Sequence, residues 1–351
     1  MTEIEIRRPD DFHVHLRRGE VLKRALLHTT QQFARALVMP NTRPGPILTA
    51  EHVSYYRGEI ISFIDSRRIN GFKPLMTIQI TPTTTPEIIE TAKKEGVVAG
   101  KVYPQGVTTH SENGVVCFSD LYSVFGVMEK LGMVLSLHGE SPEEIIPGIE
   151  KENVFLHTLR MIVRAFPKLR IVLEHITTKE AVECVMAMPD TVASTITVHH
   201  LFLTLDDVIG YSKESKGLMQ PHNFCKPIPK GVYDRAALRK AATSGNPKFF
   251  FGSDSAPHLR RNKECAFVCA GVFSAPVALP LLCQMFEYLG FLERLEAFVS
   301  KFGAEFYQLP LNEGSICFVK RDWTVPPECN KIIPFLAGQK ILWQEKRPEP
   351  L

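Results

Sequence analysis

Short apolar runs rich in β-branched residues recur along the chain, and each leads into a polar segment. Runs of four to eight such residues between polar stretches are typical of buried β-strands. Eight of these runs are present, and we predict a strand at each of them, near residues 11–16, 35–41, 75–81, 98–104, 133–140, 170–177, 192–200 and 248–255.

Segments of helical character lie between most of the predicted strands, for example residues 85–96 and 120–132. The first segment opens with Thr85 followed by proline, a favourable helix start, and Gly96 and Gly132 are suited to end the two helices. Eight strands that alternate with helices over about 245 residues predict a (β/α)8 TIM barrel. An open, doubly wound sheet is the alternative, but no predicted strand is followed by a GxGxxG or GxxxxGK[ST] motif.

Two stretches depart from this alternation. Residues 265–286 carry no charge and are long enough to cross a bilayer, but two prolines and several polar residues interrupt them. We therefore predict a buried barrel helix and its preceding loop. Beyond residue 310 the chain becomes proline-rich, and we predict two short strands or extended segments on the outside of the barrel. We expect one domain over residues 1–351, with the barrel over about 10–310 and a C-terminal extension over about 311–351.

The composition limits the partners and the compartment. Apolar residues make up 44% of the chain and the net charge is +3, without a long basic cluster, so we expect no nucleic-acid partner. The first ten residues are polar and lack the apolar segment of a signal peptide. The eight cysteines form no CxxC pair, so we expect reduced thiols, a cytoplasmic protein and no membrane partner.

Chemically distinctive side chains gather at the carboxyl ends of the predicted strands. In a (β/α)8 barrel these ends meet at one mouth, where active sites lie. Six of the eight predicted strands deliver such a residue, and the set is His13, His15, Asn41, Lys101, His138, His175 and Asp254.

The first strand and the fourth carry the strongest indications. His13 and His15 lie two positions apart, so in a strand both imidazoles face the same side and can reach one metal ion. Alone, such a pair is equally well explained by two buried histidines held by hydrogen bonds. Burial lowers the pKa of a lysine, and the neutral amine of Lys101 could add carbon dioxide to form a carbamate that bridges two ions. Without the histidines, a lysine paired with a carboxylate such as Asp254 would be the simpler interpretation.

The remaining candidates are weak singly and stronger together. His138 and His175 each follow an apolar run, as many core histidines do, and Asp254 alone could cap the next helix. Four histidines, a lysine and an aspartate at one barrel mouth are hard to explain structurally, and they supply enough ligands for two divalent ions. His199 and His200 also end a predicted strand, but nothing else supports them, and we interpret them as structural.

These segments resemble the amidohydrolase superfamily and, more closely, the dihydroorotase family of the single-domain bacterial and fungal type. The resemblance extends from residue 10 to about residue 342 and is poorer at 141–170 and 200–220. The motifs that carry it are DDFHVHLRRG at 10–19, MPNTRP at 39–44, GKVYPQGVTTHSENGV at 100–115, LHGE at 137–140, LEHIT at 173–177, PHNFCKP at 221–227, GSDSAPH at 252–258 and AGVFSAP at 270–276.

The resemblance implies a zinc-dependent cyclic amidohydrolase with two zinc ions per chain. It implies that one ion is held by His13, His15 and Asp254, and the second by His138 and His175. Carbamylated Lys101 and a hydroxide would bridge both ions.

The resemblance also implies a set of substrate contacts. Arg17, Asn41 and His258 would bind the α-carboxylate, and we expect Arg17 on the same strand face as His15. Backbone groups of Lys226 and Ala270 would contact the amide portion of the ring. Thr108 and Thr109 would belong to a mobile lid over residues 105–115. The sequence departs from the family pattern at Lys226 and at Gln220. Neither residue is one of the expected metal ligands.

The implied reaction is the reversible cyclisation of N-carbamoyl-L-aspartate to L-dihydroorotate with loss of water, a step of de novo pyrimidine biosynthesis. Asp254 would act as general base and then as general acid. We expect a homodimer that binds this small-molecule substrate.

Two alternatives stay open. A dihydropyrimidinase or allantoinase would use the same metals, but it lacks the HxHxR carboxylate anchor and has a larger β-sandwich built from both chain ends. Only nine residues precede the first motif here, so we predict no N-terminal half of such a sandwich. A non-catalytic barrel would have lost metal ligands, whereas all six positions are filled.

Overall fold

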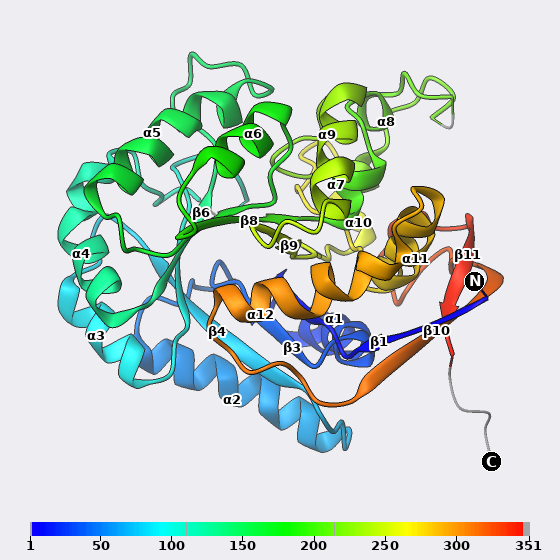
Figure 1. Ribbon diagram of the computed structural model, residues 1–351, viewed down its shortest axis with the longest axis horizontal. Helices are drawn as coiled ribbons and strands as arrows, with labels where there is room; N and C mark the ends of the chain where they lie inside the picture. The colour runs from blue at the N-terminus through cyan, green and yellow to red at the C-terminus, as the bar shows by residue number, and fades with distance from the viewer. Residues whose placement is uncertain (1, 110, 214, 347–351) are drawn as a thin grey trace.

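Eight parallel strands form one sheet in which each strand pairs with the next one along the chain. The computed structural model describes residues 2–109, 111–213 and 215–346 (Figure 1). All eight predicted strands are confirmed, although most are shorter than predicted, and the (β/α)8 barrel is confirmed with them. The strands are β2 (Asp10–Val14), β3 (Arg35–Val38), β4 (Lys73–Ile80), β5 (Ala99–Val102), β6 (Val134–His138), β7 (Ile171–Glu174), β8 (Val192–Ile196) and β9 (Phe249–Phe251).

The barrel closes just beyond the carboxyl ends of β2 and β9. The backbone amide of Asp254 donates to the carbonyl of His13 at 2.8 Å, and the amide of His15 donates to the carbonyl of Ser255 at 3.0 Å. These two hydrogen bonds join the first barrel strand to the last. They also place the segments that carry the first histidines and the aspartate side by side.

Helices surround the sheet on its outer side (Figure 1). The predicted helices 85–96 and 120–132 are confirmed as α3 and α4, and the uncharged stretch 265–286 forms a loop and most of α11. Within the described ranges, no helix is long and apolar enough to cross a membrane. The helices are α1 (Gly19–Gln32), α2 (Ala50–Ser66), α3 (Pro86–Lys94), α4 (Tyr122–Leu131), α5 (Lys151–Ala165), α6 (Lys179–Ala187), α7 (Val198–Phe202), α8 (Asp206–Ile209), α9 (Val232–Thr243), α10 (Arg260–Lys263), α11 (Ala278–Tyr288) and α12 (Phe302–Phe306), with short turns at Phe118–Leu121, Pro221–Asn223, Leu292–Arg294 and Ala297–Lys301.

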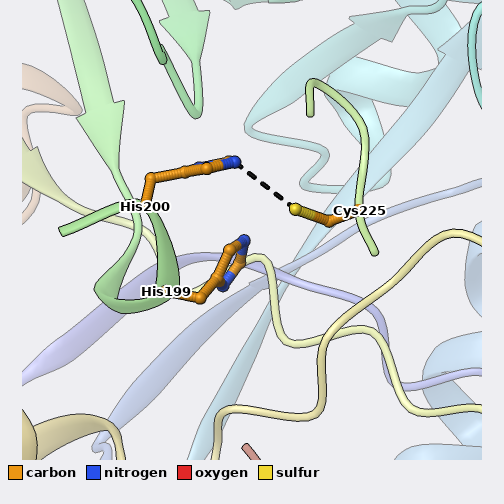
Figure 2. A group of neighbouring side chains, drawn as sticks. All are labelled: His199, His200 and Cys225. Atoms are coloured by element: carbon orange, nitrogen blue, oxygen red, sulfur yellow. Dashed lines mark hydrogen bonds between the residues drawn. The ribbon is translucent and has the colours of Figure 1, made fainter. Parts of the chain in front are cut away.

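The predicted strand 192–200 is too long at its carboxyl end. Strand β8 stops at Ile196, and the side chain of Thr197 accepts a hydrogen bond from the backbone amide of His200 at 3.1 Å. A threonine in this position caps the helix that follows it. His199 and His200 therefore lie in helix α7 and not on a strand (Figure 2).

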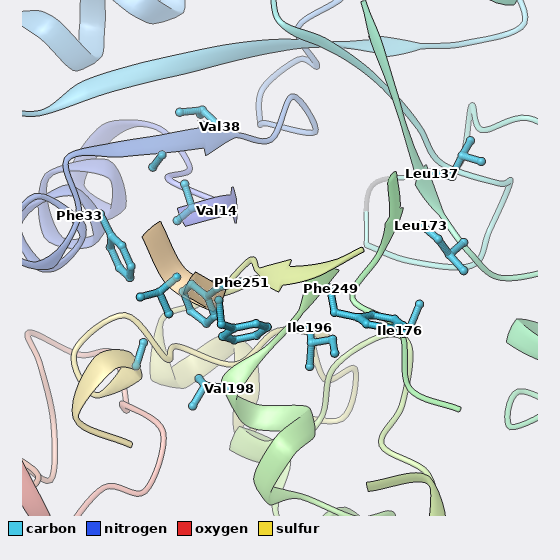
Figure 3. Close-up of a cluster of buried hydrophobic side chains, with 14 of the residues drawn as sticks. Val14, Phe33, Val38, Leu137, Leu173, Ile176, Ile196, Val198, Phe249 and Phe251 are labelled. Carbon is cyan, nitrogen blue, oxygen red and sulfur yellow. The ribbon is translucent and has the colours of Figure 1, made fainter. Parts of the chain in front are cut away.

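Alternate residues of the strands fill two separate apolar regions. Side chains such as Leu137, Phe249 and Phe251 point outward and pack against the helices (Figure 3). Phe250 points inward and belongs to a smaller cluster inside the barrel, which Tyr307 joins from the segment after α12. Because this interior cluster fills one end of the barrel with apolar side chains, polar side chains are concentrated at the other end.

A second, three-stranded antiparallel sheet lies outside the barrel. The two predicted C-terminal strands are present as β10 (Ser315–Thr324) and β11 (Lys340–Glu345), but the prediction of no N-terminal contribution is wrong. Strand β1 (Glu3–Arg7) pairs with β10, with Ile6 opposite Ile316. The small sheet is anchored on helix α11, since the indole of Trp343 donates to Glu287 at 2.9 Å. The five residues of β1 form a strand because their pairing partner, β10, comes from the other end of the chain.

Candidate active site

A small cavity lies at the carboxyl ends of the barrel strands. Ten of the thirteen residues predicted from the sequence line it, and the other three each contact a lining residue. His13 approaches Asp254 at 3.4 Å, Lys101 lies 5.1 Å from the ring centre of Tyr103, and His258 approaches Arg17 at 3.0 Å. The lining residues are His15, Arg17, Asn41, Tyr103, Thr108, Thr109, His138, His175, Lys226, Asp254, Ala256, Ala270 and Gly271.

His13, His15 and Asp254 form one compact group. Their potential ligand atoms all lie within 4.8 Å of one another, and Nε2 of His15 is 3.0 Å from Oδ1 of Asp254. His15 lies beyond the end of β2, so the same-face argument for a strand does not apply to it. The backbone bonds across the closure of the barrel bring it beside Asp254 instead.

Three residues of the site have a left-handed backbone, which is uncommon outside glycine. Their φ angles are +61° at Arg17, +42° at His175 and +43° at Asp254. Strained backbone of this kind persists where the surrounding structure holds it, and it is concentrated at functional sites. In each case the residue comes just after a strand, where the chain turns its side chain toward the cavity.

Burial leaves the imidazoles of His15, His138 and His175 neutral. It lowers the pKa of His15 to about 3 and lowers the pKa values of His138 and His175 as well. Burial also tends to raise the pKa of Asp254, but the hydrogen bond with His15 and the neighbouring histidines outweigh it and hold that pKa well below its usual value. Neutral imidazoles beside a carboxylate are the protonation states that bind a metal ion.

Several buried polar atoms of the site have no hydrogen-bond partner within the described residues. They include Nζ of Lys101, Nε2 of His13 and Nδ1 of His175, together with Oδ1 of Asn41 and the hydroxyl of Tyr103. Burial lowers the pKa of Lys101 to about 8, although the carboxylates of Glu174 and Asp254 oppose the shift. Buried polar atoms are rarely left unpaired, and a bound ion is one of the few reasons for it. This set of nitrogen and carboxylate donors fits a divalent ion such as zinc.

Two glutamates that were not predicted from the sequence orient the histidines. The carboxylate of Glu174 accepts from Nδ1 of His13 at 2.8 Å and from the hydroxyls of Ser136 and Thr195. Glu140 pairs with Nε2 of His138 at 2.6 Å. Such partners fix which ring nitrogen faces a metal ion. Each glutamate lies within two residues of a predicted histidine, in LEHIT and LHGE, but that proximity alone gives it no role.

The residues expected to bind a carboxylate lie at the rim of the cavity. A guanidinium nitrogen of Arg17 is 3.0 Å from Nε2 of His258, and that same ring nitrogen is 3.0 Å from the carbonyl of Ala270. The expectation that Arg17 shares a strand face with His15 is wrong, because β2 ends at Val14. Arg17 reaches the cavity through its left-handed backbone.

The segment expected to act as a lid lies across the cavity. Thr108 and Thr109 line it, and the side chain of Asn41 donates to the carbonyl of Thr109 at 3.3 Å. The hydroxyl of Ser111 closes the turn, because it accepts from the amide of Thr108 and donates to its carbonyl. Residue 110 of this predicted lid lies outside the described residues.

Comparisons with known proteins agree on one family. No protein-family model matches the chain. The chain is 45% identical to the dihydroorotase of Shewanella pealeana over 99% of both chains. The crystal structure of dihydroorotase from Saccharomyces cerevisiae in complex with 5-fluoroorotic acid covers 99% of both chains, with a TM-score of 0.88 and 35% identity. An L-hydantoinase from Arthrobacter aurescens shares the fold, with a TM-score of 0.81, but is only 17% identical over 98% of this chain and 83% of its own.

Proposed function

Because the chain belongs to the dihydroorotase family, we propose that it catalyses the reversible cyclisation of N-carbamoyl-L-aspartate to L-dihydroorotate, with loss of water. This reaction is a step of de novo pyrimidine biosynthesis. One observation carries the assignment of an acidic substrate. The guanidinium of Arg17 faces the same cavity as the cluster of His15, His138, His175 and Asp254. A planar guanidinium is well matched to a carboxylate, and a neutral ring would leave it unpaired.

We propose that His13, His15 and Asp254 hold one zinc ion and that His138 and His175 hold the second. Lys101, as a carbamate, would contribute to both. The unpaired nitrogens of His13, Lys101 and His175 support this assignment. When bound, divalent ions in such a site supply Lewis acidity, which polarises a carbonyl group and makes water a stronger acid.

Asp254 is the proposed proton carrier. In the direction of hydrolysis it would accept a proton from the attacking water and deliver it to the ring nitrogen that leaves. Its low pKa, held there by His15 and the neighbouring rings against the effect of burial, keeps it ionised and ready to accept. In the direction of ring closure the carboxylate of Asp254 would accept the proton of the nitrogen that closes the ring and deliver it to the departing water.

Arg17, Asn41 and His258 would hold the α-carboxylate, and backbone groups of Lys226 and Ala270 would hold the amide portion of the ring. Burial and the charge of Arg17 lower the pKa of His258 well below its usual value. His258 therefore acts as a neutral hydrogen-bonding group. Closure of the lid would bring the hydroxyls of Thr108 and Thr109 to the substrate and exclude water, which strengthens every polar contact inside.

The proposal extends to assembly and compartment. We propose a homodimeric, cytoplasmic enzyme whose partner is its small-molecule substrate, with no nucleic acid or membrane involved. All eight cysteines are free thiols, which supports a reducing compartment.

The assay that tests the function compares L-dihydroorotate with dihydrouracil, the same ring without the carboxylate. Purified protein is expected to open dihydroorotate and to close N-carbamoyl-L-aspartate, with little turnover of dihydrouracil. Elemental analysis of the same sample is expected to find at least two divalent ions per chain. Comparable turnover of both rings would overturn the acidic-substrate assignment and favour a dihydropyrimidinase.

A further inference from the structure

A second group of metal-binding side chains lies next to the proposed active site and is not part of it. Figure 2 shows His199 and His200 from helix α7 facing Cys225, which comes from the segment after the turn at Pro221–Asn223. Their ligand atoms lie within 4.8 Å of one another, and all three residues are buried. We propose that His199, His200 and Cys225 form an additional zinc site.

The unpaired ring of His199 is the first reason. The residue has no solvent exposure, and neither Nδ1 nor Nε2 has a hydrogen-bond partner in the described part of the chain. A purely structural histidine is normally held by at least one hydrogen bond when it is buried this completely. In Figure 2 one of its ring nitrogens points toward the space between His200 and the sulfur of Cys225. A metal ion in that space would give this nitrogen a partner.

The geometry around His200 is the second reason. Its Nδ1 lies 2.9 Å from the hydroxyl of Thr197, and its Nε2 lies 2.9 Å from the carbonyl of Pro227, which only accepts hydrogen bonds. In the tautomer that binds a metal ion, Nδ1 carries the ring proton and donates a hydrogen bond to Thr197, and the lone pair of Nε2 is available to the ion. That Nε2 is 3.4 Å from the sulfur of Cys225. Two ligands at ordinary zinc distances in tetrahedral geometry have a nitrogen–sulfur separation of about 3.6 Å. The observed separation therefore suits two ligands of one zinc ion with little movement.

A fourth possible metal ligand, a backbone carbonyl oxygen, lies beside the group. The carbonyl oxygen of Pro227 is 2.9 Å from Nε2 of His200 and 3.5 Å from the sulfur of Cys225. Zinc binds the deprotonated sulfur of cysteine, so binding at this site would release the proton of the Cys225 thiol.

This site would fix the wall of the active-site cavity. Cys225 immediately precedes Lys226, which lines that cavity. A zinc ion on Cys225 would hold the segment 225–227 against helix α7 and so set the position of the Lys226 backbone. This consequence rests on the proposed function, whereas the metal site itself does not.

Cobalt substitution tests the proposal without relying on activity. The protein is stripped with a chelator and reloaded with Co²⁺, and the near-ultraviolet absorption of a thiolate bound to cobalt is recorded. None of the ligands proposed for the active site contains sulfur, so this band does not come from the active site, and the cysteine variants identify the thiol that gives it. The wild type and the control Cys283→Ser, which alters another fully buried cysteine in helix α11, are expected to show the band. Cys225→Ser is expected to lack it and to bind one metal ion fewer per chain.

Either of two results would overturn the proposal: no thiolate band in the reloaded wild type, or an unchanged band and metal count in Cys225→Ser. The second result would assign the absorption to other thiols. If Cys225→Ser does not fold, His199→Gln replaces it, since this variant keeps the thiol and removes one ligand. An unchanged band and metal count in that variant also rejects the site. If the reloaded wild type shows the thiolate band but does not turn over dihydroorotate, the result counts against the proposed function and not against this site.

Discussion

Replacement of Lys101 by alanine is expected to abolish activity and to weaken metal binding together. The reason lies in the charge of the site. The two proposed divalent ions would bring four positive charges to a group in which Asp254 is the one proposed carboxylate ligand from an aspartate or glutamate. A cationic lysine would add to the repulsion, whereas a carbamate reverses its sign. Removal of one partner from a buried charged cluster costs about 3–5 kcal/mol, which corresponds to roughly 10²- to 4 × 10³-fold in metal affinity.

The environment of Lys101 favours the modification. Carbon dioxide reacts with the neutral amine, and burial lowers the pKa of this lysine from 10.5 to about 8. At pH 7.5 the neutral fraction therefore rises from about 0.1% to about one quarter, an increase of more than a hundredfold. Because burial lowers the pKa of Lys101, a larger fraction of its amine is neutral at any given pH. Carbamylation of apo-protein is expected to be faster at pH 8 than at pH 6.

The assay combines metal analysis, turnover of dihydroorotate and ¹³C NMR of protein equilibrated with labelled bicarbonate. Wild type is expected to show a carbamate resonance that Lys101→Ala lacks. Short carboxylic acids are expected to restore part of the activity of Lys101→Ala by supplying the missing bridge. Lys101→Arg should not be rescued, because a guanidinium stays charged and cannot carry the carbamate. Near-normal activity with two bound metals in Lys101→Arg would refute the bridging role.

Three further predictions concern the residues around the metal group. Arg17→Met should lower kcat/KM for dihydroorotate about ten- to hundredfold at constant metal content, since a charged hydrogen bond contributes about 1.5–3 kcal/mol; unchanged kinetics would remove Arg17 from the site. Joint replacement of Thr108 and Thr109 by alanine should lower turnover while metal content stays intact, and normal turnover would reject the lid. Glu174→Gln should weaken metal binding about 10- to 100-fold, because Glu174 holds the ring of His13. A chelator titration identical to that of wild type would contradict this last expectation.

The barrel strands could be predicted because they are buried on both faces. Every residue of β6 and β7 is buried, so the sequence shows a continuous apolar run at each. Strand β1 gave no such pattern, since most of its side chains are at least partly exposed. Its partner β10 lies more than 300 residues away, and no local pattern reveals a pairing of that kind.

The candidate site could be predicted in its residue types but not in its supporting contacts. Histidine, lysine and aspartate at strand ends are unusual enough to be noticed in the sequence. Glu174 is not, because a carboxylate within an apolar run becomes meaningful only when His13, 161 residues earlier, is placed against it. His199 was interpreted as structural, since the sequence could not show that both of its ring nitrogens would be buried without a partner.

The closure of the barrel determines when the proposed metal ligands can meet during synthesis. His13 lies on the first barrel strand, Asp254 follows the last, and backbone hydrogen bonds between the two segments complete the cylinder. A ribosome that adds roughly 5–20 residues per second needs roughly 10–50 s to translate the chain from His13 to Asp254. A nascent chain therefore carries the early histidines long before their aspartate exists. The proposed ligand set is therefore complete only after residue 254 has been made, and a product truncated before it would lack Asp254.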